Sequence, residues 1–127
     1  NKSSERKYMS ASAEEETIPH KHLLYGQDYC RHACVVCEGP LDAWAIGPGA
    51  VATFGLSYTS EQLVRIARYP VRAVCFDNEP AAQRVAKDLV DKLSMLPGET
   101  LNITLDSKDP GEATQKEIRR IRKEILE

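Results

Sequence analysis

The 127-residue chain lacks several features that would assign it to a protein class at once. It contains no apolar run long enough to cross a bilayer and no signal-peptide pattern, so we expect no membrane partner for this chain. It also lacks an excess of one charge: the formal net charge is −2, so the chain as a whole is not a general binder of nucleic acid. Any such binding must come from a local patch or from further domains. With 42% hydrophobic and 28% charged residues, the composition is that of one globular domain with a single core.

Cysteine is scarce, with only four residues, and the spacing of three of them leaves zinc open as an alternative. The cysteines stand at positions 30, 34, 37 and 75, and the histidines are His20, His22 and His32. However, Cys34 and Cys37 lie in an apolar run, residues 33–37, that is typical of a buried strand. Their odd spacing turns them to opposite faces of that strand. We therefore favour buried free thiols, which indicates a reducing, cytoplasmic location.

The first 22 residues differ from the rest of the chain. They are polar, with a run of three glutamates at 14–16, and they show no sustained periodicity. We expect residues 1–22 to be a loop-rich segment at the edge of an upstream subdomain, and residues 23–127 to form the main domain. The polar start without an initiator Met predicts a piece of a longer protein.

From residue 33 onward, strand and helix patterns alternate four times. The predicted strands cover residues 33–37, 50–54, 71–76 and 101–105. Helices are expected between them: a capping-box pattern at 59–62 starts one, Pro80 starts another, and Asp109 is expected to cap the last. This alternation predicts an α/β fold with a four-stranded, mainly parallel, Rossmann-like sheet flanked by helices. The first and third strands are continuously apolar, so we expect them at the centre of the sheet.

Carboxylates follow three of the four predicted strands. They are Glu38 and Asp42 after the first strand, Asp77 and Glu79 after the third, and Asp106 and Asp109 after the fourth. Because these junctions share one edge of a parallel sheet, the acids are expected to converge on one crevice. Capping of the following helix is the alternative role for Asp77 and Glu79. Convergence of several acids favours a site for a divalent cation and phosphate chemistry.

The same residues resemble a known family, the Toprim domain of bacterial-type primases, topoisomerases and several nucleases. The two central motifs are Glu38-Gly39-x-x-Asp42-Ala43 and Cys75-Phe76-Asp77-x-Glu79. Four further stretches resemble the primase members: Lys7-Tyr8-Met9-Ser10, Leu24-Tyr25-Gly26, Val51-Ala52-Thr53-Phe54-Gly55 and Lys108-Asp109-Pro110. The resemblance runs from about Lys7 to about Glu112, and the order and spacing of its elements are specific.

This resemblance implies a phosphoryl-transfer centre that depends on Mg²⁺ or Mn²⁺. The family pattern makes Glu38 a general acid/base or a metal contact, and it makes Asp77 and Glu79 metal ligands. Asp42 and Asp109 would support the metal shell and belong to the same catalytic set.

The resemblance also implies a substrate and partners. Lys7 and Lys108 match family positions that bind the nucleotide. The function implied is RNA primer synthesis on a single-stranded DNA template from ribonucleoside triphosphates, as the catalytic part of a DNA primase. Such a domain is expected to need flanking domains and a replicative helicase or a fused helicase domain. A Toprim-family nuclease and a non-catalytic docking or nucleic-acid-binding module are the alternatives.

Three positions depart from the family pattern. Glu79 stands where the second acid of an Asp-x-Asp pair is usual, Ala82 replaces a glycine, and Gly111 replaces an acid. Glu112 is a possible substitute for the missing acid. Glutamate still ligates hard cations, so we expect the site to be retained.

Overall fold

The computed structural model describes residues 24–55 and 57–127, and it contains one four-stranded sheet. The strands are β1 (Ala33–Cys37), β2 (Ala50–Ala52), β3 (Val71–Val74) and β4 (Glu99–Asn102). All neighbours pair in parallel, in the order β2-β1-β3-β4. The prediction of a parallel sheet with the first and third strands at its centre is therefore confirmed.

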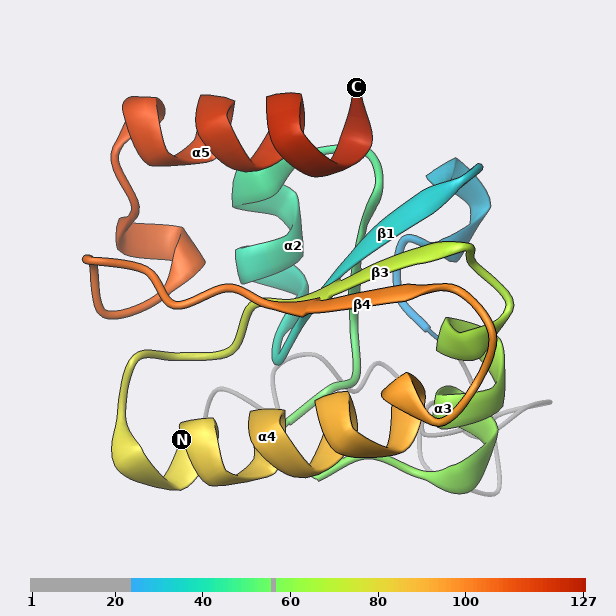
Figure 1. Ribbon diagram of the computed structural model, residues 1–127. Helices are drawn as coiled ribbons and strands as arrows, with labels where there is room; N and C mark the ends of the chain where they lie inside the picture. The colour runs from blue at the N-terminus through green and yellow to red at the C-terminus, as the bar shows by residue number, and fades with distance from the viewer. Residues whose placement is uncertain (1–23, 56) are drawn as a thin grey trace, which may run out of the picture.

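Helices cover both faces of the sheet and make three layers (Figure 1). On one face lie α2 (Pro40–Ile46) and α5 (Gln115–Ile121), and on the other lie α3 (Ser60–Ala67) and α4 (Pro80–Ser94). The shorter turns are η2 (Gln27–Tyr29), η3 (Pro110–Glu112) and η4 (Arg122–Leu126), the last a π-helical continuation of α5. In the part of the chain that the structure describes, no helix has the length and apolar character needed to cross a membrane.

The central strand β1 explains why the sheet is covered on both faces. All five of its residues are buried, and alternate side chains enter different cores. Cys34 and Val36 pack with α3 and α4, whereas Val35 and Cys37 pack with α2 and α5. Without a polar face, β1 is stable only between two helical layers, as expected for the interior of a parallel sheet.

The cysteines are free thiols in this fold. Cys34 and Cys37 are completely buried and belong to the two different cores, so they cannot share one zinc ion. Burial raises the pKa of the Cys75 thiol to about 12, which keeps it protonated. The zinc alternative is therefore wrong for this pair, and the buried hydrophobic role is the one observed.

Three strand boundaries differ from the predicted ones. Strand β2 ends at Ala52 and not at residue 54, because Phe54 adopts a positive φ of 66° that interrupts extended backbone. Strand β3 ends at Val74, two residues early. Strand β4 covers residues 99–102 and not 101–105, since Glu99 already donates a hydrogen bond to the Pro70 carbonyl at 2.7 Å.

The helix cap predicted at residues 59–62 is confirmed, whereas the one predicted at Asp109 is wrong. The Thr59 side chain accepts a hydrogen bond from the Gln62 amide in a full capping box, as predicted for α3. Asp109, however, caps only the short turn η3. Ala113 is extended, with ψ of 147°, and separates that turn from α5, which has its own capping box from Thr114 to Glu117.

One buried arginine was not anticipated from the sequence. Arg72 on β3 is completely buried, and its guanidinium lies between the carboxyl ends of α3 and α4. It donates to the carbonyls of Ala67 at 3.0 Å, Pro97 at 2.8 Å and Leu93 at 3.1 Å. The Thr100 hydroxyl accepts two further hydrogen bonds from it. Through these hydrogen bonds, Arg72 connects α3 and α4 to strand β3.

Candidate metal centre

The strand order defines where a ligand would bind. From β1 the chain crosses to β2 on one side and then to β3 on the other, so the topological switch point lies between β1 and β3. In open α/β sheets, ligands bind outside the carboxyl ends of the strands at this point. Glu38 directly follows β1, and Asp77 comes three residues after β3. Both acids therefore lie at the edge where a site is expected.

Three aspartates meet at this edge. One carboxylate oxygen from each of Asp42, Asp77 and Asp109 lies within 4.8 Å of the other two. Asp42 belongs to the first turn of α2, Asp77 to the loop after β3, and Asp109 is the N-cap residue of η3. Three different elements thus position what we call the aspartate trio.

Backbone amides hold two members of the trio in place. The Gly111 amide donates to Asp42 Oδ1 at 3.2 Å, and the Glu112 amide donates to Asp109 Oδ1 at 2.9 Å. A Cβ atom at Gly111 would lie 3.2 Å from Asp109 Oδ1 and 3.4 Å from Asp42 Oδ1. Gly111 therefore lets the backbone of η3 approach both carboxylates closely.

Glu38 is tied to the trio through Asp77. Its Oε1 accepts a hydrogen bond from the Asp77 amide at 2.9 Å. Its own carbonyl accepts from the Gly55 amide at 2.8 Å, which connects the end of β2 to the end of β1. The positive φ values of Phe54 and Gly55 turn the chain there, so this bend after β2 helps to position Glu38.

The electrostatic environment of the site favours a bound cation. Among the residues that the structure describes, Asp77 Oδ1 is the one buried side-chain oxygen without a hydrogen-bond partner. Burial and then the neighbouring carboxylates, Glu38 first among them, raise the pKa of Asp77 to about 7. Burial also raises the pKa values of Glu38 and Asp42. An unpaired buried oxygen among crowded carboxylates fits a hard divalent cation with oxygen ligands.

We expect the metal-free chain to lose stability as the pH rises from about 4 to about 7. Folded Asp77 keeps its proton up to about pH 7, whereas the unfolded carboxyl releases its proton near pH 4, so the folded state binds more protons in this window. Because Asp77 is only half-buried, solvent screening limits the loss to about 1 kcal/mol, or roughly 4 °C in Tm. Thermal unfolding in EDTA at about pH 5 and about pH 8 measures this. A higher Tm at the alkaline pH would contradict it.

Comparison with known proteins agrees with this geometry. The sequence pattern of the Toprim-like family matches residues 35–114, from β1 through η3. The chain belongs to the Toprim-like family. The matched segment contains the aspartate trio and Glu38. No curated protein sequence gives a significant match.

Solved structures of primases are among those similar to this Toprim-like domain. The primase of Aquifex aeolicus, with its zinc-binding and RNA polymerase domains, superposes with a TM-score of 0.71 at 18% identity, over 87% of this chain and 31% of that one. The catalytic domain of the DnaG primase bound to single-stranded DNA gives 0.68 at 25% identity, over 86% and 40%. The primase fragment of the bacteriophage T7 primase-helicase protein gives 0.63 at 18% identity, over 84% and 49%.

The similarity covers only part of each solved protein. This chain spans from about a third to about half of the length of the solved proteins. At 18% identity, the Aquifex and T7 structures establish a shared fold.

Of the other predicted site residues, the structure describes Glu79, Asp106 and Lys108. Glu79 is exposed and is the N-cap residue of α4, but its side chain makes no capping hydrogen bond. It lies close enough for its charge to contribute to the raised pKa of Glu38. Asp106 and Lys108 are exposed on the loop after β4, outside the trio. Lys7 lies outside the described residues.

Several supporting residues of the Toprim-like site were missed in the sequence. Asn78 donates to the Leu105 carbonyl at 2.7 Å and joins the loops after β3 and β4. Gln83 donates to the Asp77 carbonyl at 3.0 Å. Glu117 accepts hydrogen bonds from the Asp106 amide and the Ser107 hydroxyl, and the Ser107 bond lowers its pKa. Only the position of Asn78, between two predicted site acids, was a signal in the sequence.

Proposed function

We propose that this chain is the metal-dependent catalytic Toprim part of a primase, which adds ribonucleotides to an RNA primer on single-stranded DNA. The observation that carries the proposal is the aspartate trio at the switch point of the sheet, with the unpartnered Asp77 Oδ1 inside it. The likeness to the catalytic domain of the DnaG primase bound to single-stranded DNA supports primase over the other Toprim activities.

In this proposal Asp77 and the neighbouring acids hold the divalent cation. Asp42 and Asp109 would complete its protein ligands, with Glu38 and the exposed Glu79 at its margin. Mg²⁺ or Mn²⁺ bound there would neutralise these carboxylates and the phosphates of the incoming nucleotide. Few protein ligands leave room for substrate oxygens, as is usual for Mg²⁺.

Glu38 is the proposed proton acceptor. Its hydrogen bond to the Asp77 amide fixes the carboxylate beside the trio, and burial raises its pKa toward the range suited to proton transfer. The primer 3′-oxygen forms a bond to the α-phosphorus of the nucleotide while the bond to the leaving pyrophosphate breaks. The proton of the 3′-hydroxyl passes to the Glu38 carboxylate. Positioning and charge neutralisation are then the main contributions of the protein.

The proposed partners are single-stranded DNA, ribonucleoside triphosphates and a replicative helicase or a fused helicase domain. The last of these is suggested by the primase fragment of the T7 primase-helicase protein, which shares this fold. Lys108, exposed on the loop after β4, is a candidate contact for the nucleotide phosphates. Lys7 keeps the same proposed role from the sequence pattern.

We expect Glu38→Gln to fold normally, yet to reduce primer synthesis by about 10²-fold or more. Glutamine keeps an oxygen that can accept the Asp77 amide, but it cannot take up a proton at neutral pH. The measurement is nucleotide incorporation on single-stranded DNA by the full-length protein that contains this chain, with Mn²⁺ present. The matched control is Asp106→Asn, which neutralises an exposed acid outside the trio and should leave incorporation unchanged.

Two outcomes would count against the proposal. If Glu38→Gln makes primers at the parental rate, Glu38 is not the proton acceptor. If the parent protein cleaves DNA but joins no nucleotides, the same acids serve a Toprim nuclease.

A further inference from the structure

Four exposed cations form a line along the outer side of α5 and its continuation η4. We call this line the basic stripe, and it consists of Lys116, Arg119, Arg120 and Lys123. Spacings of three, four and seven residues place these side chains on one side of a helix. The opposite side carries Ile118 and Ile121, which are buried in the core. No acid within residues 24–55 and 57–127 forms an ion pair with the stripe.

The needs of the helix itself do not explain the stripe. Like charges at these spacings repel each other and weaken a helix. Cations near the carboxyl end are favoured by the helix dipole, but Lys116 lies in the first turn, where the dipole disfavours it. The stripe also does not reflect a generally basic composition, because the net charge of the chain is −2.

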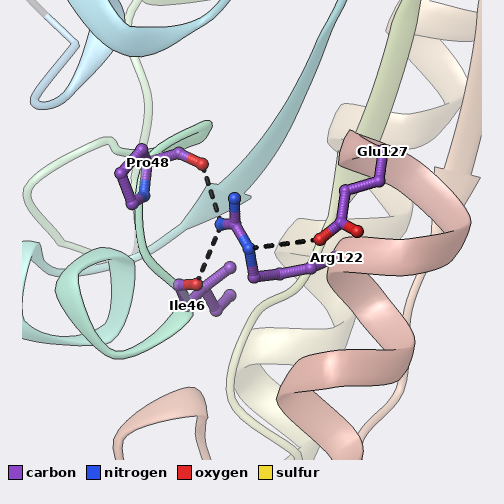
Figure 2. A network of polar contacts seen from close by, with 4 residues as sticks. All are labelled: Ile46, Pro48, Arg122 and Glu127. Atoms are coloured by element: carbon purple, nitrogen blue, oxygen red, sulfur yellow. Dashed lines mark hydrogen bonds and ion pairs between the residues drawn. The ribbon is translucent and has the colours of Figure 1, made fainter.

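Two other charged residues of this helix, Arg122 and Glu117, have partners in the rest of the domain, whereas Glu124 is exposed beside the stripe. Arg122 Nη1 donates to the carbonyls of Ile46 at 3.1 Å and Pro48 at 2.8 Å, and its Nε lies 3.8 Å from Glu127 Oε2 (Figure 2). Glu117 accepts from the Asp106 amide and the Ser107 hydroxyl. These contacts fix the rotation of the helix about its axis, so the stripe faces outward on a rigid support.

We propose that the basic stripe binds the sugar-phosphate backbone of single-stranded nucleic acid. This inference rests on the proposed function, because it assumes a polyanionic template for the same domain. A row of cations without acidic partners complements a row of phosphates, and it needs no base-specific contact. From Lys116 to Lys123 the stripe extends about 10 Å along the helix.

The position of α5 links the stripe to the aspartate trio. The helix starts three residues after Glu112, the end of η3, whose N-cap residue Asp109 belongs to the trio. From there it runs back along the sheet as part of the outer layer (Figure 1). A strand bound to the stripe is thus led away from the edge that carries the acids.

The packing of α5 disfavours an anionic membrane as the partner. An amphipathic helix that binds a bilayer inserts its apolar face. In this helix Ile118 and Ile121 are already packed against the sheet. The cations of the stripe are exposed, but the helix has no free apolar face to insert into a bilayer.

The test compares two double variants of this 127-residue chain that each remove two charges. Lys116→Gln with Arg120→Gln removes half of the stripe, and Arg68→Gln with Arg84→Gln removes two exposed cations of the opposite helical layer. Binding of a fluorescein-labelled oligothymidylate of about 20 nucleotides is followed by anisotropy from about 50 to about 200 mM salt. We expect the stripe variant to bind about tenfold more weakly at the lowest salt. Its salt slope should fall by about 1.4, or 0.7 per lost phosphate contact, and the control should match the parent.

The inference would be overturned by an absence of binding by the parent, by an equal loss in both variants, or by an unchanged slope in the stripe variant. Vesicles of phosphatidylserine serve as a second probe. A stripe variant that loses vesicle binding but retains oligothymidylate binding also overturns the inference. Glu38→Gln should bind oligothymidylate as the parent does, so a failure of strand binding is distinguishable from a failure of nucleotide transfer.

Discussion

Asp77→Asn is expected to abolish Mn²⁺ binding and, at the same time, to stabilise the metal-free chain at neutral pH. Asp77 Oδ1 is buried without a hydrogen-bond partner in the described part of the chain. Burial and the nearby Glu38 carboxylate raise the pKa of Asp77, so its charged form is disfavoured. Asparagine removes that charge and can donate to a neighbouring carboxylate. The same substitution therefore removes a metal ligand and relieves the repulsion between Asp77 and Glu38.

Calorimetric titration with Mn²⁺ and thermal unfolding in EDTA measure the two effects. We expect no detectable heat of binding and a Tm higher by a few degrees, since about 1 kcal/mol moves the Tm of a domain of this size by roughly 4 °C. Primer synthesis by the full-length protein should fall to background. The matched control is Asp91→Asn on α4, which breaks only the exposed pair with Lys87 and should leave both measurements unchanged.

The opposite outcome has a clear meaning. An aspartate with a purely structural role would lose hydrogen bonds on replacement, and the chain would melt at a lower temperature. If Asp77→Asn binds Mn²⁺ as well as the parent, the metal-centred interpretation is wrong.

The second large effect concerns Arg72. We expect Arg72→Met to lower the free energy of unfolding by about 3 to 5 kcal/mol. The guanidinium donates to carbonyls at the carboxyl ends of α3 and α4, including Ala67 and Leu93. Each helix end carries a partial negative charge of about half a unit, so two of them offset the buried positive charge. Methionine fills the volume but leaves these buried carbonyls without a donor.

Urea denaturation and thermal unfolding measure this loss, which corresponds to a fall in Tm of roughly 10 to 20 °C. Arg72→Lys keeps the charge but offers a compact ammonium in place of a planar fork, so it should lie between the parent and Arg72→Met. Arg84→Met, at an exposed position of α4, is the control and should change stability by less than about 0.5 kcal/mol. If Arg72→Met has the same free energy of unfolding as Arg84→Met, the buried guanidinium is not what joins the two helices to the sheet.

The sequence by itself determined the architecture of this protein. The continuous apolar run at residues 33–37 required a strand covered on both faces, and its parallel neighbours follow from the helices between the strands. The capping box at Thr59 was readable because it depends on residues three apart. Acids at strand ends had to share one edge, which is a property of any parallel sheet. These features depend on local conformation and periodicity, which neighbouring residues decide.

The tertiary structure alone decided which acids meet and what supports them. Asp42 and Asp109 are far apart in the chain, and they come together because the Gly111 amide of η3 binds the Asp42 carboxylate on α2. The strand pattern around Arg72 gives no sign of its partners, since two of them, the carbonyls of Leu93 and Pro97, lie more than 20 residues away in the chain. The orientation of α5 likewise depends on Arg122 reaching the Ile46 carbonyl. Side-chain contacts between distant elements are set by how those elements pack, and periodicity carries no record of that packing.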